Sequence, residues 1–193
     1  IFFQKYSQMS RSQQGLAGAG EWETLRKLLP DFKDKRVLDL GCGYGWHCIY
    51  AMEHGASSVV GVDISHKMLE VAKEKTHFPQ VEYKCCAIED VEFPEESFDV
   101  ILSSLAFHYV ADYEILVKKI YRILKSGGKL VFTVEHPVFT AYGTQDWYYN
   151  EKGEILHFPV DNYYYEGKRT AVFLGEKVTK FHRTLTTYLN TLL

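Results

Sequence analysis

From residue 35 to about residue 136, short apolar runs alternate with helical patterns, and this alternation restricts the possible folds more than any other feature. The runs lie at residues 37–40, 58–63, 81–86, 98–103 and 129–135. The first is not an alternating pattern, which is typical of a strand buried on both faces. Strands that alternate with helices form a mostly parallel sheet with right-handed crossovers. We therefore predict an α/β fold with helices on both faces of the sheet.

Three helical patterns separate these runs. The first covers residues 44–54 and stops at Gly55. Ser65 is a suitable N-cap for the second and Asp112 for the third. The basic side of the third, at residues 118–125, is interpreted as a solvated face and not as a nucleic-acid patch. Its apolar stripe consists of Tyr113, Leu116, Val117, Ile120 and Leu124.

Composition limits the class of protein. The chain has 193 residues, 46% of them apolar, and a net charge of −3. One domain is expected, and the scattered basic residues argue against a nucleic-acid partner. No apolar run reaches the ~20 residues of a membrane span, and no signal-peptide pattern is visible. Because the chain lacks an initiator Met and stops within an apolar pattern, we expect the natural protein to extend beyond both ends.

The four cysteines are Cys42, Cys48, Cys85 and Cys86. None stands in a pattern with histidines that indicates zinc, so no metal site is predicted. Buried free thiols are favoured over a redox pair for the vicinal Cys85 and Cys86. This use of cysteine is typical of a reducing cytoplasm, where we expect the protein to act.

The single domain divides into four parts. Residues 1–34 form an N-terminal cap and a helix, residues 35–136 form the ligand-binding core, residues 137–180 form an aromatic-rich insertion, and residues 181–193 return to the core. The helix of the first part is expected to be amphipathic, and residues 178–182 are expected to return to the sheet. The apolar face of that helix consists of Trp22, Leu25, Leu28 and Leu29.

Gly41, Gly43 and Gly45 lie between the first strand and the next helix. Glycine allows a positive φ and a close approach of backbone to ligand, and the helix start presents free N–H groups. The loop suits a dinucleotide pyrophosphate or the amino-acid end of a nucleoside cofactor. A dinucleotide fingerprint requires its third glycine at the position of Trp46.

Asp63 ends the second strand, 22 positions after Gly41. A carboxylate at this place can accept hydrogen bonds from both hydroxyls of a ribose. Helix capping is the alternative role, with Ser65 as the rival cap. We favour ribose binding, since an unpaired acid at the end of a buried strand is costly.

These segments together resemble a known family. Residues 37–45 (VLDLGCGYG) and 60–65 (VGVDIS) resemble the first two motifs of class I S-adenosylmethionine-dependent methyltransferases, which have a Rossmann-like fold. Residues 87–90 (AIED), 98–104 (FDVILSS) and 124–130 (LKSGGKL) resemble their later motifs. The subgroup that they most resemble contains the small-molecule enzymes of ubiquinone and menaquinone biosynthesis. The seventh, antiparallel strand of that family has no counterpart in this sequence.

The resemblance implies a cofactor site residue by residue. The backbone of residues 41–45, including Cys42, approaches the methionine portion of S-adenosylmethionine, and Asp39 orients this loop or contacts the ammonium through water. Asp63 binds the ribose hydroxyls. The remaining residues implied are Ile64 and Ile88 on either side of the adenine, Glu89 near its amine, and Ser103 and Ser104 near the methionine carboxylate.

Candidate acceptor-binding residues follow the fourth and fifth strands. His108 and His136 can each act as a general base or shape the pocket by hydrogen bonding. Glu135 can bind an acceptor amine or anchor a loop. The aromatic tract at 137–165, with Tyr142 and Trp147 as candidate pocket residues, forms an acceptor lid or an aromatic hairpin packed on the domain. The polar segment at 6–20 folds over the cofactor or is disordered.

The sequence therefore predicts an S-adenosylmethionine-dependent methyltransferase that releases S-adenosylhomocysteine and acts on a small molecule, as a monomer or homodimer. Two alternatives stay open. One is a non-catalytic protein that binds S-adenosylmethionine, because methyl transfer demands no particular catalytic residue. The other is a nicotinamide-dependent oxidoreductase, against which Trp46 and the later motifs argue.

Overall fold

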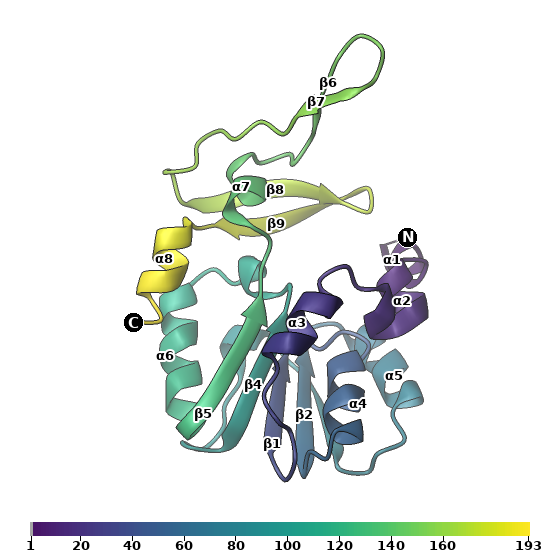
Figure 1. Ribbon diagram of the computed structural model, residues 1–193, viewed down its shortest axis with the longest axis vertical. Coiled ribbons are helices and arrows are strands. Elements are labelled where there is room, and N and C mark those ends of the chain that lie inside the picture. The colour runs from purple at the N-terminus through teal and green to yellow at the C-terminus, as the bar shows by residue number, and fades with distance from the viewer. Residues whose placement is uncertain (1) are drawn as a thin grey trace.

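The computed structural model describes residues 2–193 and contains a central sheet of five parallel strands (Figure 1). The strand order is β3-β2-β1-β4-β5, so the order reverses between β1 and β4. This confirms the predicted α/β fold. Ligands of such sheets bind at the carboxyl ends of the strands near the reversal. The strands are β1 (Arg36–Leu40), β2 (Ser58–Asp63), β3 (Val81–Cys85), β4 (Phe98–Ser104) and β5 (Leu124–Thr133).

Consecutive residues of β1 alternate between two apolar cores, one on each face of the sheet. Leu38 and Leu40 pack with the buried face of α6 (Tyr113–Ile123). Val37 packs with α4 (Trp46–Glu53) and α5 (His66–Lys75). Burial on both faces explains why β1 is a continuous apolar run instead of an alternating one.

Side-chain caps fix the starts of two helices. The backbone N–H of Met68 donates to Ser65 Oγ at 3.4 Å, and that of Ile115 donates to Asp112 Oδ1 at 2.9 Å. Both predicted N-caps are confirmed. Helix α4 begins two residues later than predicted, at Trp46, because Gly45 has a left-handed backbone with a φ of 74°.

Two predictions are wrong. One concerns Leu124 at the start of β5, and the other concerns the burial of Cys85 and Cys86 at the end of β3. Leu124 is not part of the stripe on α6, since the helix ends at Ile123 and Leu124 pairs with Phe98 as the first residue of β5. Cys85 is exposed and Cys86 is half-buried, because β3 is an edge strand of the sheet. All four cysteines are free thiols.

The N-terminal segment is helical. It contains α1 (Phe2–Ser7), α2 (Ser10–Gln14), the 3-10 helix η1 (Gly15–Gly18) and α3 (Trp22–Leu28). In α3, Trp22 and Leu25 are buried as predicted, whereas Leu28 is 65% exposed because the helix ends there, outside the apolar contact. Figure 1 shows α1 and α2 near the end of the sheet at which β2 leads into α5.

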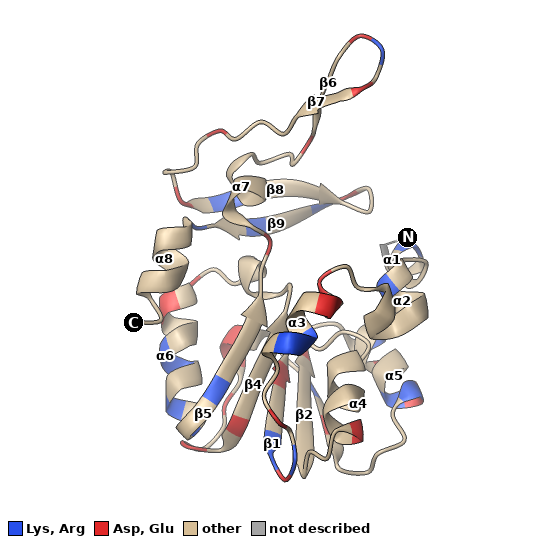
Figure 2. Ribbon diagram, in the orientation of Figure 1, with Lys and Arg blue, Asp and Glu red and all other residues tan. Residues whose placement is uncertain are grey.

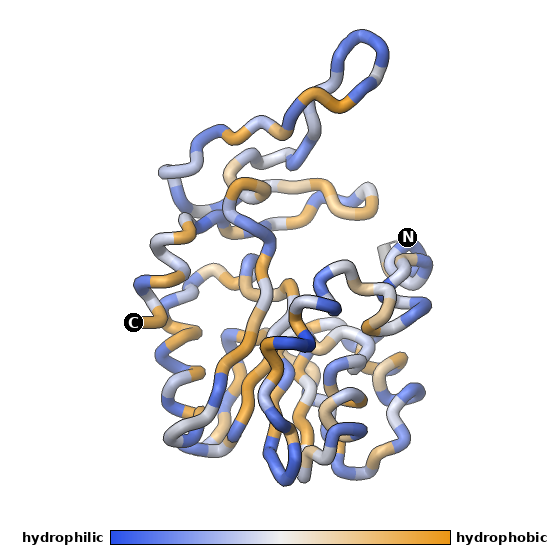
Figure 3. Tube along the Cα trace, viewed as in Figure 1, coloured by the Kyte–Doolittle hydropathy of each residue, from blue (hydrophilic) through white to orange (hydrophobic). Residues whose placement is uncertain are grey.

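Beyond the sheet, the chain forms two hairpins. A short helix α7 (Pro137–Ala141) leads to β6 (Tyr148–Tyr149) and β7 (Ile155–His157), and β8 (Gly167–Phe173) pairs with β9 (Glu176–His182). The expected return of residues 178–182 to the central sheet is therefore wrong, because these residues pair with β8 instead. The β6–β7 hairpin projects farthest from the sheet, and its tip is hydrophilic (Figures 1 and 3).

The chain returns to the body through α8 (Leu185–Asn190). Tyr188 of α8 joins the apolar core and packs edge-on against Tyr113 of α6 at a centroid distance of 5.0 Å. Lys and Arg are spread over several elements (Figure 2). Among residues 2–193, no helix is long and apolar enough to cross a membrane.

Candidate active site

A cavity of about 740 Å³ lies at the carboxyl ends of the strands. Pockets for small molecules measure ~300–1,000 Å³, so this volume is within the usual range. Its wall is formed by the glycine loop, by the segments that follow β2, β3, β4 and β5, by helices α1 and α2, and by the β8–β9 hairpin. The residues that line it include Tyr6, Arg11, Gly41, Gly43, Asp63, Ile64, Ile88, Glu89, Ser104, His108, Tyr109, Val110, Glu135, Phe173 and Val178.

The glycine loop requires its glycines for two different reasons. Gly41, Gly43 and Gly45 all have a positive φ, which costs a residue with a Cβ about 1–2 kcal/mol. Among the described residues, a Cβ on Gly43 would have only the Tyr6 hydroxyl nearby, at 3.8 Å, because Gly43 lines the cavity. A Cβ on Gly45 would collide with the hydroxyl of Tyr83. Gly43 therefore leaves space for a ligand, while Gly45 lets α4 pack on the sheet.

Asp63 connects the glycine loop to the end of β2. Its Oδ2 accepts a hydrogen bond from the backbone N–H of Gly43 at 2.9 Å, and its Oδ1 accepts one from Ser65 at 2.8 Å. Burial raises the pKa of this carboxyl, and the two backbone donors oppose that shift. A carboxylate has about four lone-pair sites, so two acceptor positions stay available on this residue, which lines the cavity.

Apolar side chains lie beside Asp63 on the cavity wall. Ile64 follows it directly and lines the cavity. Its side chain is 74% exposed, which is a large exposed fraction for an isoleucine. Ile88 and Glu89 belong to the 3-10 helix η2 (Ile88–Asp90), which also lines the cavity. Lys119 of α6 holds η2 in place by donating to the backbone oxygen of Glu89 at 2.5 Å. The apolar faces and the adjacent polar groups suit a flat heterocycle.

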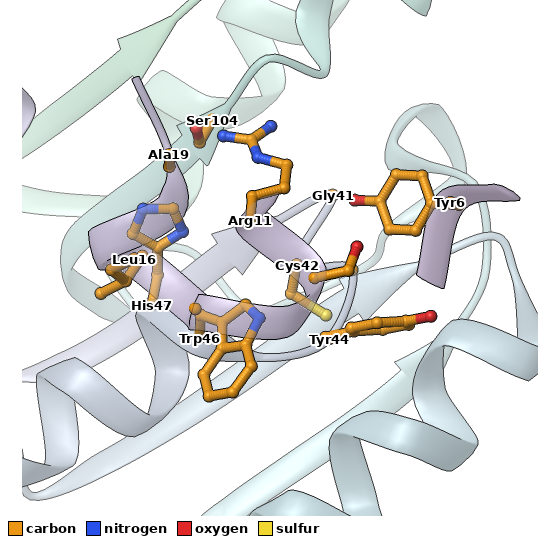
Figure 4. A pocket seen from close by; sticks show the side chains of 13 residues that line it. Tyr6, Arg11, Leu16, Ala19, Gly41, Cys42, Tyr44, Trp46, His47 and Ser104 are labelled. Atoms are coloured by element: carbon orange, nitrogen blue, oxygen red, sulfur yellow. The ribbon is translucent and has the colours of Figure 1, made fainter. Parts of the chain in front are cut away.

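A smaller cavity of about 60 Å³ adjoins the glycine loop and is rich in hydrogen-bond donors (Figure 4). The guanidinium of Arg11 points toward Ser104 in this view, and the hydroxyl of Tyr6 points toward Gly41. The Ser12 hydroxyl and the Trp46 indole N–H are buried and have no hydrogen-bond partner among the described residues. The Arg11 guanidinium also lines this cavity and is a group suited to an anion.

Ionised and polar groups around Arg11 tie the N-terminal helices to the sheet. Arg11 pairs with Glu21, and Ser104 Oγ donates to the same carboxylate oxygen at 3.1 Å. His47 lines this cavity as well, and burial together with Arg11 lowers its pKa to about 4. The segment at 6–20 thus packs over the glycine loop, and its folding over the cofactor stays a prediction.

Three of the predicted cofactor residues, Asp39, Ser103 and Gly45, lie behind the cavity wall. Asp39 is 1% exposed, and its Oδ2 accepts from Cys48 Sγ at 3.5 Å while burial raises its pKa to about 7. Ser103 is buried and donates to the backbone oxygen of Leu40 at 2.8 Å. Asp39, Ser103 and Gly45 therefore contact the strands and helix α4 instead of the cavity. Cys42 lines the smaller cavity.

The other end of the large cavity contains His108, Tyr109 and Glu135. His108 belongs to the 3-10 helix η3 (Phe107–Tyr109) and is 1% exposed. The backbone N–H of Glu135 donates to its Nδ1 at 3.4 Å, and its Nε2 lies 3.9 Å from Glu135 Oε1. Burial lowers the pKa of His108 to about 4, so the ring is neutral near pH 7. Burial also raises the pKa of Tyr109 to about 12.

Glu135 is held from the outer side by two residues of the insertion. Lys180 of β9, which is 3% exposed, donates to Glu135 Oε1 at 2.6 Å. Gln145 Nε2 donates to Oε2 at 2.8 Å, and Gln145 Oε1 accepts from Lys180 at 2.8 Å. Burial by itself would raise the pKa of Glu135, but the hydrogen bonds and the nearby charge of Lys180 hold it below its usual value.

Three predicted acceptor residues, His136, Tyr142 and Trp147, are not among the residues that line the cavity. His136 is exposed, and its Nδ1 accepts from the backbone N–H of Val138 at 3.2 Å, so it caps α7. Trp147 contacts Phe139 and Phe158, and Tyr142 contacts Phe158 as well. These aromatic rings pack on one another, away from the described cavity wall.

Sequence patterns gave no indication of several cavity residues. Arg11 lies in a polar segment with no motif, and Phe173 and Val178 lie in a part of the chain that resembles no named motif, as does Lys180, which contacts the cavity residue Glu135. For Phe173, Val178 and Lys180, the sequence offers only the alternation of inward and outward residues along β8 and β9. Val178 and Lys180 share the inward face of β9.

Comparisons with known proteins agree with this geometry. A family model described as a methyltransferase domain matches residues 38–132. The crystal structure of a protein from Listeria monocytogenes, assigned as S-adenosylmethionine-dependent methyltransferase, is 58% identical with a TM-score of 0.86, and the match covers 90% of this chain and 81% of that chain. This chain belongs to the S-adenosylmethionine-dependent methyltransferases. Its cofactor is S-adenosylmethionine, and its sheet is that of the class I fold.

Two further relatives of this methyltransferase support the assignment. A crystal structure of an S-adenosylmethionine-dependent methyltransferase from Mesorhizobium loti is 42% identical with a TM-score of 0.85, covering 92% of this chain and 81% of that chain. The ubiquinone biosynthesis O-methyltransferase of Coxiella burnetii is 36% identical over 112 residues, which are 57% of this chain and 47% of that protein. The second match reaches only about half of the relative's length and shows a shared cofactor-binding core.

Proposed function

We propose that this methyltransferase transfers the methyl group of S-adenosylmethionine to a small-molecule acceptor. The observation that carries the proposal is the continuity of one cavity, which extends from Asp63 and the glycine loop to His108 and Glu135. Helices α1 and α2 and the β8–β9 hairpin contribute to its wall. A concave site bounded by these elements fits a small molecule better than a folded macromolecule.

The nucleoside end of the cofactor is proposed to bind between Asp63 and η2. Asp63 accepts hydrogen bonds from the ribose hydroxyls through the acceptor sites that Gly43 and Ser65 leave available. Ile64 and Ile88 provide the apolar surfaces for the adenine, with Glu89 near its amine. The 74% exposure of Ile64 supports this assignment, since a bound ring would cover that side chain.

The methionine end is proposed to reach the smaller cavity. Arg11 provides several N–H donors for its carboxylate, beside the ion pair that it makes with Glu21. A carboxylate accepts about four hydrogen bonds and gains most from a guanidinium partner. The position of Arg11, which lines both the smaller and the larger cavity, is the observation that supports this placement.

The chemistry demands little of the chain beyond alignment. S-adenosylmethionine supplies a methyl group on a sulfonium, which is already an activated leaving group. The chain must therefore align the acceptor atom with the methyl group and keep water out. The neutral His108 and the ionised Glu135 are polar groups at the acceptor end, and Tyr6, Phe173 and Val178 supply apolar surface around them.

Binding and turnover test the proposal separately. Isothermal titration with S-adenosylhomocysteine and with NAD should show saturable binding of the first compound alone. Incubation with methyl-labelled S-adenosylmethionine and a fractionated pool of metabolites should then yield a labelled product of low molecular mass. Tight binding without any labelled product would favour a non-catalytic binding protein, and labelling confined to macromolecules would exclude a small-molecule acceptor.

A further inference from the structure

Among the described residues that line the acceptor end of the cavity, Glu135 is the ionised group, and its charge is already balanced. Lys180 donates to Glu135 Oε1 at 2.6 Å and lies 6.0 Å from the centre of the Tyr109 ring. The chain therefore supplies its own cation both to the carboxylate and to the nearest aromatic face. A cationic acceptor would compete with Lys180 for both of these groups. The site is electrostatically suited to an uncharged acceptor.

His108 and Glu135 leave a gap that a single polar atom can fill. Because the backbone N–H of Glu135 occupies His108 Nδ1, the hydrogen of the neutral ring belongs on Nε2. Nε2 lies 3.9 Å from Glu135 Oε1, which is too long for a direct hydrogen bond. One donor and one acceptor thus lie side by side among the residues that line the cavity, and a single polar atom can accept from the first and donate to the second.

A hydroxyl group matches this pair. Its oxygen accepts from His108 Nε2–H, and its hydrogen is donated to Glu135 Oε1. An ammonium group cannot accept from His108, and an ether cannot donate to Glu135. The neighbouring wall consists of Val110, Phe173 and Val178, which suit an apolar body next to the hydroxyl.

We propose that His108 and Glu135 together bind a hydroxyl group on an uncharged, otherwise apolar acceptor, with Lys180 and Gln145 holding the carboxylate in place. The inference rests on the proposed function, since it names the acceptor class of the same cavity. It assigns recognition of the acceptor and leaves open which atom is methylated.

Three probes that share one ring test the hydroxyl. Benzyl alcohol, benzyl methyl ether and benzylamine are titrated into the protein saturated with S-adenosylhomocysteine, and their dissociation constants are measured by ligand-observed NMR. A hydrogen bond to a charged group changes affinity by about tenfold or more. Benzyl alcohol should therefore bind at least about tenfold more tightly than the other two compounds. Equal affinity for the ether, a preference for the amine, or no saturable binding of the alcohol would overturn the proposal.

Variants test the residues. Glu135→Leu combined with Lys180→Met removes both charges together, which avoids leaving one buried ion without its partner. This double variant and His108→Phe should each lose the preference for the alcohol and keep their affinity for S-adenosylhomocysteine within about twofold. His136→Phe is the matched control, because this exposed histidine lies outside the cavity. Retention of the preference in His108→Phe would show that the histidine does not bind the hydroxyl.

S-adenosylhomocysteine binding separates this inference from the proposed function. If the unmodified protein does not bind S-adenosylhomocysteine, the proposed function fails. If it binds S-adenosylhomocysteine and labels a small molecule but does not discriminate between the three probes, only the assignment of a hydroxyl fails.

Discussion

The carboxylate of Asp63 accepts a hydrogen bond from the backbone N–H of Gly43 at 2.9 Å. This contact joins the end of β2 to the loop after β1, so a single side chain shapes two parts of the cofactor site. The carboxylate remains partly open to the cavity, which allows it to hold the loop and to bind a ligand at the same time.

Replacing Asp63 by alanine should weaken S-adenosylmethionine binding about 10- to 100-fold. The loss corresponds to ~1–3 kcal/mol, the range for hydrogen bonds that involve a charged group. Isothermal titration measures the change. Asp161→Ala is the matched control, because Asp161 is an exposed acid of the insertion. Affinity that is unchanged in Asp63→Ala would contradict ribose binding by this residue.

Gly45→Ala should destabilise the protein by more than the cost of its backbone conformation. The left-handed φ costs about 1–2 kcal/mol, and the collision with the Tyr83 hydroxyl adds to it. Gly127→Ala separates the two effects, since Gly127 has the same φ of 74° and a Cβ added there would meet no atom within 4 Å. Urea denaturation should show a clearly larger loss for Gly45→Ala. Equal losses would mean that Tyr83 moves aside without cost.

Asp39 should make folding stability depend on pH between about 4 and 7. Its pKa is about 7 in the folded protein because of burial, and an unfolded aspartate titrates near its ordinary value of 3.8. Between these values the folded state holds more protons than the unfolded state. Stability from this group therefore increases as the pH falls from above 7 toward 4.

The variant Asp39→Asn isolates that contribution. The difference in unfolding free energy between the unmodified protein and this variant, measured by urea denaturation at several pH values, should favour the unmodified protein progressively more as the pH falls. A difference that is constant from pH 5 to pH 8 would show that Asp39 titrates outside this window.

His108 should remain neutral throughout the physiological pH range. Burial lowers its pKa to about 4, with Glu135 opposing the shift and Lys180 adding to it. Nitrogen-15 NMR of the imidazole should report a neutral ring with its hydrogen on Nε2 from pH 8 to about pH 5. A titration midpoint between pH 6 and pH 7 would make His108 a candidate general base and would weaken its assignment as a hydrogen-bond donor.

The sequence determined the sheet and the position of the cofactor site because both depend on local patterns. A continuous apolar run marks β1, and the glycines and Asp63 follow their strands directly, so their places at the carboxyl edge could be predicted. Burial of individual side chains was less predictable. Ser103 and Ser104 are adjacent in sequence, yet Ser103 lies behind the cavity wall and Ser104 lines it, since successive residues of a strand face opposite ways.

Only the tertiary structure decided which distant residues meet at the cavity. Arg11 comes from a helical segment without a recognisable motif, and Lys180 contacts Glu135 across 45 positions of sequence. Tyr142 and Trp147 were candidates by residue type, but their rings pack with Phe158. Pairing between buried charges and packing between aromatic rings depend on the three-dimensional path of the chain, which local patterns do not contain. For this reason the methyl donor could be predicted from the sequence, whereas the acceptor end of the site required the structure.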